Sequence, residues 1–165
     1  MKTLVAYYSE TDNTRRLAEA IYESINAAEK DIVPIGEAVP DPYDIIFVGF
    51  PVKANSVPGK VEKFIKSIPE GRKLAFFLTH GSMRGGQLAV TALHHAMGLA
   101  ARQTILGSFG CRGQVRADVI DSLLQKPEHR AWAMEAQSAD GHPDGADLED
   151  GREFADAMIA KSRNM

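Results

Sequence analysis

The chain has 165 residues, of which 44% are hydrophobic, and a formal net charge of -3. This length and composition are enough for one sizeable core, so we expect a single domain over residues 1–165. The only cysteine, Cys111, excludes an internal disulfide framework and a four-cysteine metal site, and no apolar run approaches the ~20 residues that a membrane helix requires.

The first residues lead directly into a strand pattern. The opening MKTLVAYY contains no charged, apolar and small-residue leader of the secretory kind, so we expect a cytoplasmic protein. The apolar run Thr3–Tyr8 has the length of a strand, and a helical pattern from Leu17 to Ala28 follows a polar loop. A shorter strand is expected at Asp31–Ile35.

The middle of the chain continues to alternate strands with helices. Asp44–Phe50 and Lys73–Thr79 are apolar runs rich in β-branched and aromatic residues, without the alternation of a half-exposed strand. Such runs are typical of strands that are buried on both faces. A helical pattern lies between them at Val61–Ile68, with Pro58 placed to start it, and another follows at Leu88–Leu99.

The last third predicts one more strand and three helices. The strand is expected at Gln103–Gly110, and helices at Val115–Leu124, at Glu128–Gln137 and from about Leu148, where Asp147 can serve as the cap. This alternation of strand and helix indicates a doubly wound parallel sheet. Ligands of such sheets bind beyond the carboxyl ends of strands, so the candidate loops are 9–14, 51–57, 80–86 and 111–114.

The first of these loops is dense in hydroxyls and amides. Ser9, Thr11, Asn13 and Thr14 immediately precede a helix. A helix N-terminus offers unpaired backbone N–H groups and a partial positive charge, so polar side chains placed there can complete a phosphate site. The alternative is plain helix capping, which these residue types favour, although one cap needs only one of them.

The stretch SETDNT resembles the phosphate loop of the flavodoxin family, Ser/Thr-x-Thr-Gly-Asn-Thr, with Asp12 at the glycine position. YDIIFVGFPV looks like the third strand and flavin-ring loop of that family. The tail GCRGQV…GHPDGADLEDGREFA is similar to a short-chain flavodoxin-like branch with a His-Pro containing C-terminal segment. The resemblance implies an α/β three-layer sandwich, with a five-stranded parallel sheet of order 2-1-3-4-5 and helices on both faces.

The same resemblance implies FMN as the cofactor, with no catalytic residue and no metal site. It places the phosphate in the first loop and the flavin ring between the loops after the third and fourth strands. The residues that it assigns to the cofactor are Ser9, Glu10, Thr11, Asp12, Asn13, Thr14, Pro51, Val52, Lys53, Thr79, His80, Gly81 and Ser82. Aspartate at position 12 tolerates a left-handed backbone but adds a negative charge, which Arg15 and Arg16 could offset.

The two expected ring loops contain neither tryptophan nor tyrosine, and the only tryptophan, Trp132, lies far along the chain. Electron-rich aromatic faces disfavour the anionic reduced flavin, so their absence is expected to raise the reduction potential. Lys53, Arg84 and Arg112 act in the same direction, because cations near the ring stabilise the anion. We expect a less negative potential than that of a strongly acidic flavodoxin.

The net charge conceals a strong partition along the chain. Residues 51–117 carry ten basic and two acidic side chains, between an acidic first segment and an acidic last segment. The pattern is consistent with chance clustering on solvated faces. If this basic segment surrounds the flavin, the electron partners should present acidic faces. The acidic flanks and the lack of a stacking motif argue against a nucleic-acid partner, and we expect no membrane partner.

Three functions follow as hypotheses. The first is an FMN-binding protein that transfers electrons between a reductase and a partner redox enzyme. The second is an NAD(P)H-dependent FMN oxidoreductase of the quinone reductase type, and the third is a flavin-free binding module on the same fold. Cys111 is either a small buried hydrophobe or a thiol near the flavin, and His142 is either a turn residue or a contact of the flavin edge.

Overall fold

In a computed structural model that describes residues 1–165, five strands form one parallel sheet. They are β1 (Lys2–Tyr7), β2 (Glu29–Pro34), β3 (Ile45–Pro51), β4 (Lys73–His80) and β5 (Thr104–Arg112), and a short 3-10 turn, η1 (Ile35–Glu37), follows β2. Their order in the sheet is β2-β1-β3-β4-β5, and every neighbouring pair is parallel. The predicted fold class and strand order are confirmed.

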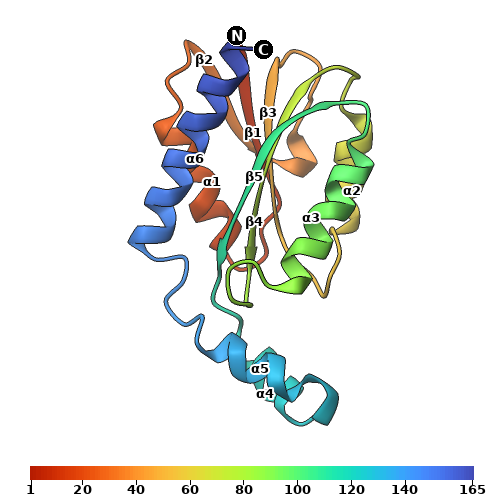
Figure 1. Ribbon diagram of the computed structural model, residues 1–165, viewed down its shortest axis with the longest axis vertical. Helices are drawn as coiled ribbons and strands as arrows, with labels where there is room; N and C mark the ends of the chain where they lie inside the picture. The colour runs from red at the N-terminus through yellow and green to blue at the C-terminus, as the bar shows by residue number, and fades with distance from the viewer.

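Helices cover both faces of this sheet. Figure 1 shows α1 (Asn13–Ser24) and α6 (Gly145–Arg163) on one face, and α2 (Gly59–Ser67) and α3 (Gln87–Leu99) on the other. The two chain ends lie together at the edge opposite the carboxyl ends of the strands. None of the helices combines the length and the apolar character that crossing a membrane would require.

Two separate cores lie on the two sides of the sheet. Phe76 belongs to the core under α2 and α3, whereas its neighbour Phe77 belongs to the core under α1 and α6. Phe50 and Phe47 divide between the same two cores. Because successive residues of a strand point to opposite faces, a strand covered on both sides must be apolar throughout. This explains the runs without alternation in β3 and β4.

A pair of helices lies outside the three layers. Between β5 and α6 the chain forms α4 (Ala117–Leu124), a 3-10 turn η2 (Pro127–His129) and α5 (Arg130–Gln137). Figure 1 shows α4 and α5 beyond the carboxyl ends of the strands, away from both cores. They pack against each other through a small cluster of their own whose buried members are Ile120, Ala133 and Ala136. The pair therefore extends the molecule at the edge where ligands of such sheets bind.

The start of the last helix differs from the sequence prediction. Helix α6 begins at Gly145, and Asp144 is its N-cap in place of Asp147. The Asp144 side chain accepts a hydrogen bond from the Asp147 N–H at 2.9 Å, and Asp147 Oδ2 accepts one from the Asp144 N–H at 2.9 Å. The two aspartates thus form a reciprocal capping box, which satisfies two N–H groups instead of one.

Candidate functional site

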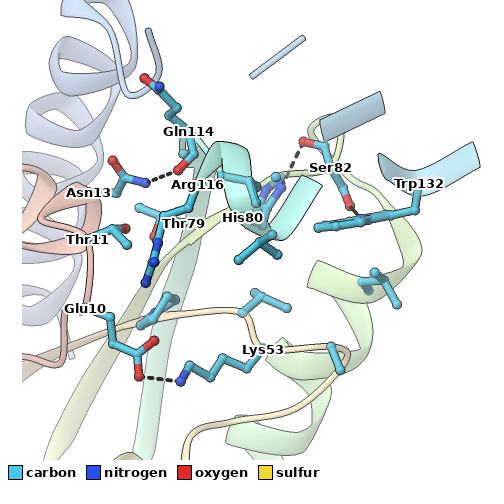
Figure 2. Close-up of a pocket in the computed structure, with 18 of the residues that line it drawn as sticks. Glu10, Thr11, Asn13, Lys53, Thr79, His80, Ser82, Gln114, Arg116 and Trp132 are labelled. Atoms are coloured by element: carbon cyan, nitrogen blue, oxygen red, sulfur yellow. Dashed lines mark hydrogen bonds and ion pairs between the residues drawn. The ribbon is translucent and has the colours of Figure 1, made fainter. Parts of the chain in front are cut away.

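A cleft of about 1000 Å³ lies at the carboxyl ends of the strands. It is lined by the loops that follow β1, β3, β4 and β5, together with the start of α3 and the inner side of α4, η2 and α5. Figure 2 shows Glu10, Thr11 and Asn13 at one end of this cleft and Trp132 at the other. Its volume is at the upper end of the range for small-molecule sites.

The loop after β1 presents a row of unpaired backbone donors. Asp12 has φ 66° and ψ -6°, the left-handed conformation that glycine would take in the flavodoxin phosphate loop. Helix α1 begins at the next residue, and none of the N–H groups of residues 9–14 donates a hydrogen bond within the chain. Six successive free donors at a helix N-terminus are suited to an anion.

The polar side chains of this loop divide into two groups. Glu10, Thr11 and Asn13 line the cleft, and Asn13 Nδ2 donates to the Gln114 carbonyl at 2.9 Å. Ser9, Asp12 and Thr14 do not line it. Ser9 Oγ accepts from the Arg15 N–H at 3.3 Å, the Asp12 carboxylate pairs with Arg15 at 3.1 Å, and Thr14 is buried.

Thr14 connects the first loop to the fourth strand. Its Oγ1 lies 2.8 Å from Oγ1 of Thr79, and both residues are buried. Thr79 lines the cleft, so this hydrogen bond fixes the start of α1 against the end of β4. Thr14 therefore positions the loop. The charge of Asp12 is offset by Arg15, as expected, while Arg16 has no such pairing.

The other two loops that the sequence singled out face the same cleft. Pro51, Val52 and Lys53 line it after β3, and Thr79, His80, Gly81 and Ser82 line it at the end of β4. The backbone N–H groups of Gly81 and Ser82 also donate no hydrogen bond within the chain. The cleft thus offers free donors at two places, one beside α1 and one beside β4.

His80 is held as a neutral, oriented ring. Burial lowers the pKa of its imidazole, and its Nδ1 lies 3.0 Å from the Ser82 carbonyl. A carbonyl oxygen only accepts, so Nδ1 carries the proton and donates it. Nε2 of the neutral ring is then left as a hydrogen-bond acceptor.

The cations at the cleft are paired with carboxylates from the acidic ends of the chain. Lys53 pairs with Glu10, and this bond holds the pKa of the Glu10 carboxyl below its usual value. Arg116 pairs with Asp118 at 2.7 Å. The basic middle of the sequence and its acidic flanks therefore meet in space at this edge of the sheet. Their charges largely offset one another there.

Arg112, at the end of β5, ties the loop after β4 to helix α5. Its guanidinium donates to the carbonyls of Gly81 at 3.3 Å and Ser82 at 3.1 Å, and also to the carbonyl of Glu135 at 3.1 Å. It further contacts the carbonyl and the hydroxyl of Ser138. A planar guanidinium can serve so many acceptors at once because its donors form a rigid fork. The backbone on the outer side of the cleft is thereby fixed.

A second tie runs from the loop after β4 to the start of α6. Arg84 donates to Asp147 Oδ1 at 2.9 Å, and Nδ1 of His142 lies 2.5 Å from Asp147 Oδ2. The carbonyl of His142 accepts from the Gln114 N–H at 2.7 Å. His142 does not line the cleft, and it supports the loop after β5 through Gln114, which does line it.

Asp147 should make the stability of this protein depend on pH in acid. Burial alone would raise the pKa of its carboxyl, but bonds from Asp144, His142 and Arg84 outweigh that effect and lower it. Because the folded pKa is lowered, this stabilisation is complete above about pH 5 and is lost as the pH falls below the unfolded value of about 3.9.

Asp147→Asn should therefore lower the free energy of unfolding at pH 7 by about 1–3 kcal/mol, the worth of hydrogen bonds to a charged group. Urea unfolding measured from pH 7 to pH 3 should show the difference between variant and wild type shrinking towards acid. A difference that stays constant, or grows, would contradict this role for the carboxylate.

The sequence prediction missed the contribution of α4, η2 and α5. Val119, Leu123, His129 and Trp132 all line the cleft, although they lie in no strand-end loop. The two helices themselves were expected, at Val115–Leu124 and Glu128–Gln137, but periodicity does not reveal what a helix packs against. Cys111 is buried, and burial raises the pKa of its thiol to about 12, so it is a small hydrophobe and no nucleophile.

The donor groups and the lining of the cleft are of the kinds that FMN would need. The unpaired N–H groups of residues 9–14 suit a phosphate, and those of Gly81 and Ser82 suit the polar edge of a flavin ring. The apolar lining lies beyond them, where the ring would follow the phosphate along the cleft.

Comparison with known proteins agrees with this geometry. The sequence profile of the flavodoxin domain matches residues 4–156. The flavodoxin-like domain-containing protein BilS of Clostridioides difficile is 29% identical over an alignment 175 positions long, gaps included, which covers 98% of each chain. Oxidised flavodoxin 2 of Bacillus cereus is 19% identical with a TM-score of 0.66, and the match covers 98% of this chain and 99% of that one.

A flavoprotein of Lactobacillus acidophilus that was solved in complex with FMN is 17% identical. Its TM-score is 0.54, and the match covers 66% of this chain and 92% of that one. At these levels of identity, the two solved structures show the shared fold.

Proposed function

The chain belongs to the flavodoxin domain family, and we propose that it binds FMN in the cleft and transfers electrons between a reductase and a partner redox enzyme. The observation that carries the proposal is the row of six unpaired N–H groups at residues 9–14, beside a left-handed Asp12. Free donors at a helix N-terminus favour the binding of a phosphate. We expect this exchange to take place in the cytoplasm.

The protein's part in this function is to bind and orient the cofactor. Thr11 and Asn13 stand beside the phosphate donors, and Gly81 and Ser82 offer theirs to the polar edge of the ring. Bound FMN would supply the electron-accepting and electron-donating chemistry. In this proposal no side chain has to act as an acid or base.

Purified protein loaded with FMN tests the proposal in two steps. First, FMN should remain bound through gel filtration and be released on unfolding. Second, the reduced protein should pass electrons to a one-electron acceptor, whereas NAD(P)H alone should not reduce it. Rapid reduction by NAD(P)H without any reductase would instead support the oxidoreductase of the quinone reductase type.

We expect the bound flavin to have a less negative potential than that of a strongly acidic flavodoxin. Lys53 lies at the rim of the cleft, and the charge of Arg112 lies directly behind the carbonyls of Gly81 and Ser82. Both charges stabilise an anion at the ring. Replacing Lys53 by Met should make reduction of the bound flavin less favourable by about 1 kcal/mol, which is the interaction energy of two unit charges about 4 Å apart in water.

Redox titration of the FMN-loaded protein measures this effect. Lys66→Met is the matched control, because Lys66 lies on α2 and pairs with Glu62, away from the cleft. The control should leave the potential unchanged. A very low potential in the wild type, or equal potentials for the two variants, would overturn this account of the cations.

For the partners, we propose acidic contact faces. Lys53, Arg84 and Arg116 are all about half exposed, with side-chain exposures of 51%, 46% and 63%. Each is already paired with a carboxylate of this chain, so we expect a modest loss of electron-transfer rate as salt rises. Rates that are equal at low and high ionic strength would remove this proposal.

A further inference from the structure

Trp132 occupies a fixed position at the wall of the cleft. Its Nε1 donates a hydrogen bond to Ser82 Oγ at 3.0 Å, so the indole is held against the loop after β4 (Figure 2). A side chain at Gly81 would lie only 3.3 Å from the Trp132 ring. The indole is therefore bonded to Ser82 and lies beside Gly81, the two residues whose free N–H groups suit the flavin's polar edge.

No other large aromatic side chain lines the cleft. Of its lining residues, only Trp132 is a phenylalanine, tyrosine or tryptophan. The loops at 51–57 and 80–86, which hold the ring in the flavodoxin pattern, contain none. A planar apolar ring in this cleft has one aromatic partner available, and that partner belongs to α5.

The inner side of the helical pair is apolar and only partly covered. Its buried members are Ile120, Ala133 and Ala136, whereas Leu123 and Trp132 are partly buried and Val119 is 39% exposed. Val119, Leu123 and Trp132 all face the cleft. Apolar side chains that face an open cleft are in contact with water. Covering them with an apolar ligand is favourable, because it removes that surface from water.

We propose that Trp132 is the aromatic wall of the flavin site, in place of the aromatic residues that the ring loops lack. The proposal rests on the proposed function, because it assigns the apolar end of the cleft to the isoalloxazine ring of FMN. Ser82 positions the indole through Nε1, and Arg112 holds α5 in place through Glu135 and Ser138. The helical pair thus contributes a cofactor-contacting residue.

Two measurable consequences follow from a contact between an indole and a flavin. Excited flavin takes an electron from an electron-rich ring that touches it, so its fluorescence is short-lived. An electron-rich ring also disfavours the anionic reduced form. Removing the indole should therefore lengthen the fluorescence lifetime of bound FMN, raise its reduction potential, and weaken FMN binding about threefold to tenfold, the worth of one aromatic contact.

The experiment compares Trp132→Leu with Trp132→Tyr, each loaded with FMN. The leucine variant should show a long lifetime and a raised potential, whereas the electron-rich tyrosine should retain short-lived fluorescence. The control adds Met134→Trp to Trp132→Leu, because Met134 is on the same helix and is 58% exposed, outside the cleft. This tryptophan should not restore the short lifetime.

The outcomes separate this proposal from the proposed function. If the wild type binds FMN and Trp132→Leu has the same lifetime and potential, the wall assignment is wrong and FMN binding stands. The wall assignment would also be wrong if adding Met134→Trp to Trp132→Leu restored the short fluorescence lifetime. If the wild type binds no FMN at all, the proposed function fails as well. Should Trp132→Leu not fold by circular dichroism, Trp132→Phe, which keeps a ring but is a poor electron donor, replaces it.

Discussion

Asn13→Asp is expected to weaken FMN binding about 100-fold, because it places a negative charge at the phosphate, where a charge pair near a protein surface is worth several kcal/mol. Asn13 lines the cleft at the first residue of α1, among the unpaired N–H groups of residues 9–14. The substitution changes neither size nor shape. It also removes the hydrogen bond from Nδ2 to the Gln114 carbonyl. The measurement is fluorescence titration of the apoprotein with FMN and, separately, with riboflavin.

Riboflavin lacks the phosphate, so its affinity should change little in Asn13→Asp. The matched control is Asp12→Asn, the opposite exchange one residue earlier. Asparagine also accepts the left-handed backbone at φ 66°, and the lost negative charge should tighten FMN binding about fivefold. If both substitutions change FMN affinity in the same direction, or if riboflavin responds as strongly as FMN, the phosphate does not lie at this loop.

The second large effect is expected at Arg112. Arg112→Met keeps the unbranched apolar stem of the side chain but removes the guanidinium, and with it every donor to Gly81, Ser82, Glu135 and Ser138. Carbonyls left without partners carry a desolvation cost, so the free energy of unfolding should fall by about 3 kcal/mol. FMN affinity should fall as well, because the loop after β4 and helix α5 lose their common anchor. Urea unfolding and FMN titration measure the two effects.

Two further variants establish the cause. Arg112→Lys keeps the charge but has no planar fork, so it should rescue only a small part of either loss. Arg130→Met removes an exposed arginine from the start of α5 and should change stability by less than about 0.5 kcal/mol. If Arg112→Lys is as stable as the wild type, the positive charge alone accounts for the effect. If Arg112→Met is as stable as the wild type, Arg112 does not anchor the loop after β4 to α5.

The layers of the fold could be predicted because their signals are local. Strands β3 and β4 are covered on both faces, so their apolar runs are continuous, and Pro58 marks the start of α2 exactly one residue before Gly59. Most strand boundaries moved by one or two residues, as for β2, which begins at Glu29. Helix α1 moved further, because it begins at Asn13 and ends at Ser24, whereas the apolar pattern that predicted it runs from Leu17 to Ala28. The start of α6 was wrong because several aspartates compete for the cap, and only their mutual hydrogen bonds decide between them.

The candidate site could be predicted only where it follows strand ends. The three loops meet in one cleft because the carboxyl ends of parallel strands share an edge. Trp132 could not be placed there, since it is on a helix whose position depends on Arg112 and on the hydrogen bond to Ser82. The pairing of the basic middle segment with Glu10, Asp118 and Asp147 is equally non-local. Charge counted along the chain did not reveal it.

Whether the cleft binds FMN is decided by incubating the purified apoprotein with excess FMN and recording its absorbance spectrum after gel filtration. Flavin bands should co-elute with the protein at close to one FMN per chain, and the bound flavin should be weakly fluorescent. A protein that elutes without flavin absorbance after incubation with excess FMN would contradict FMN binding.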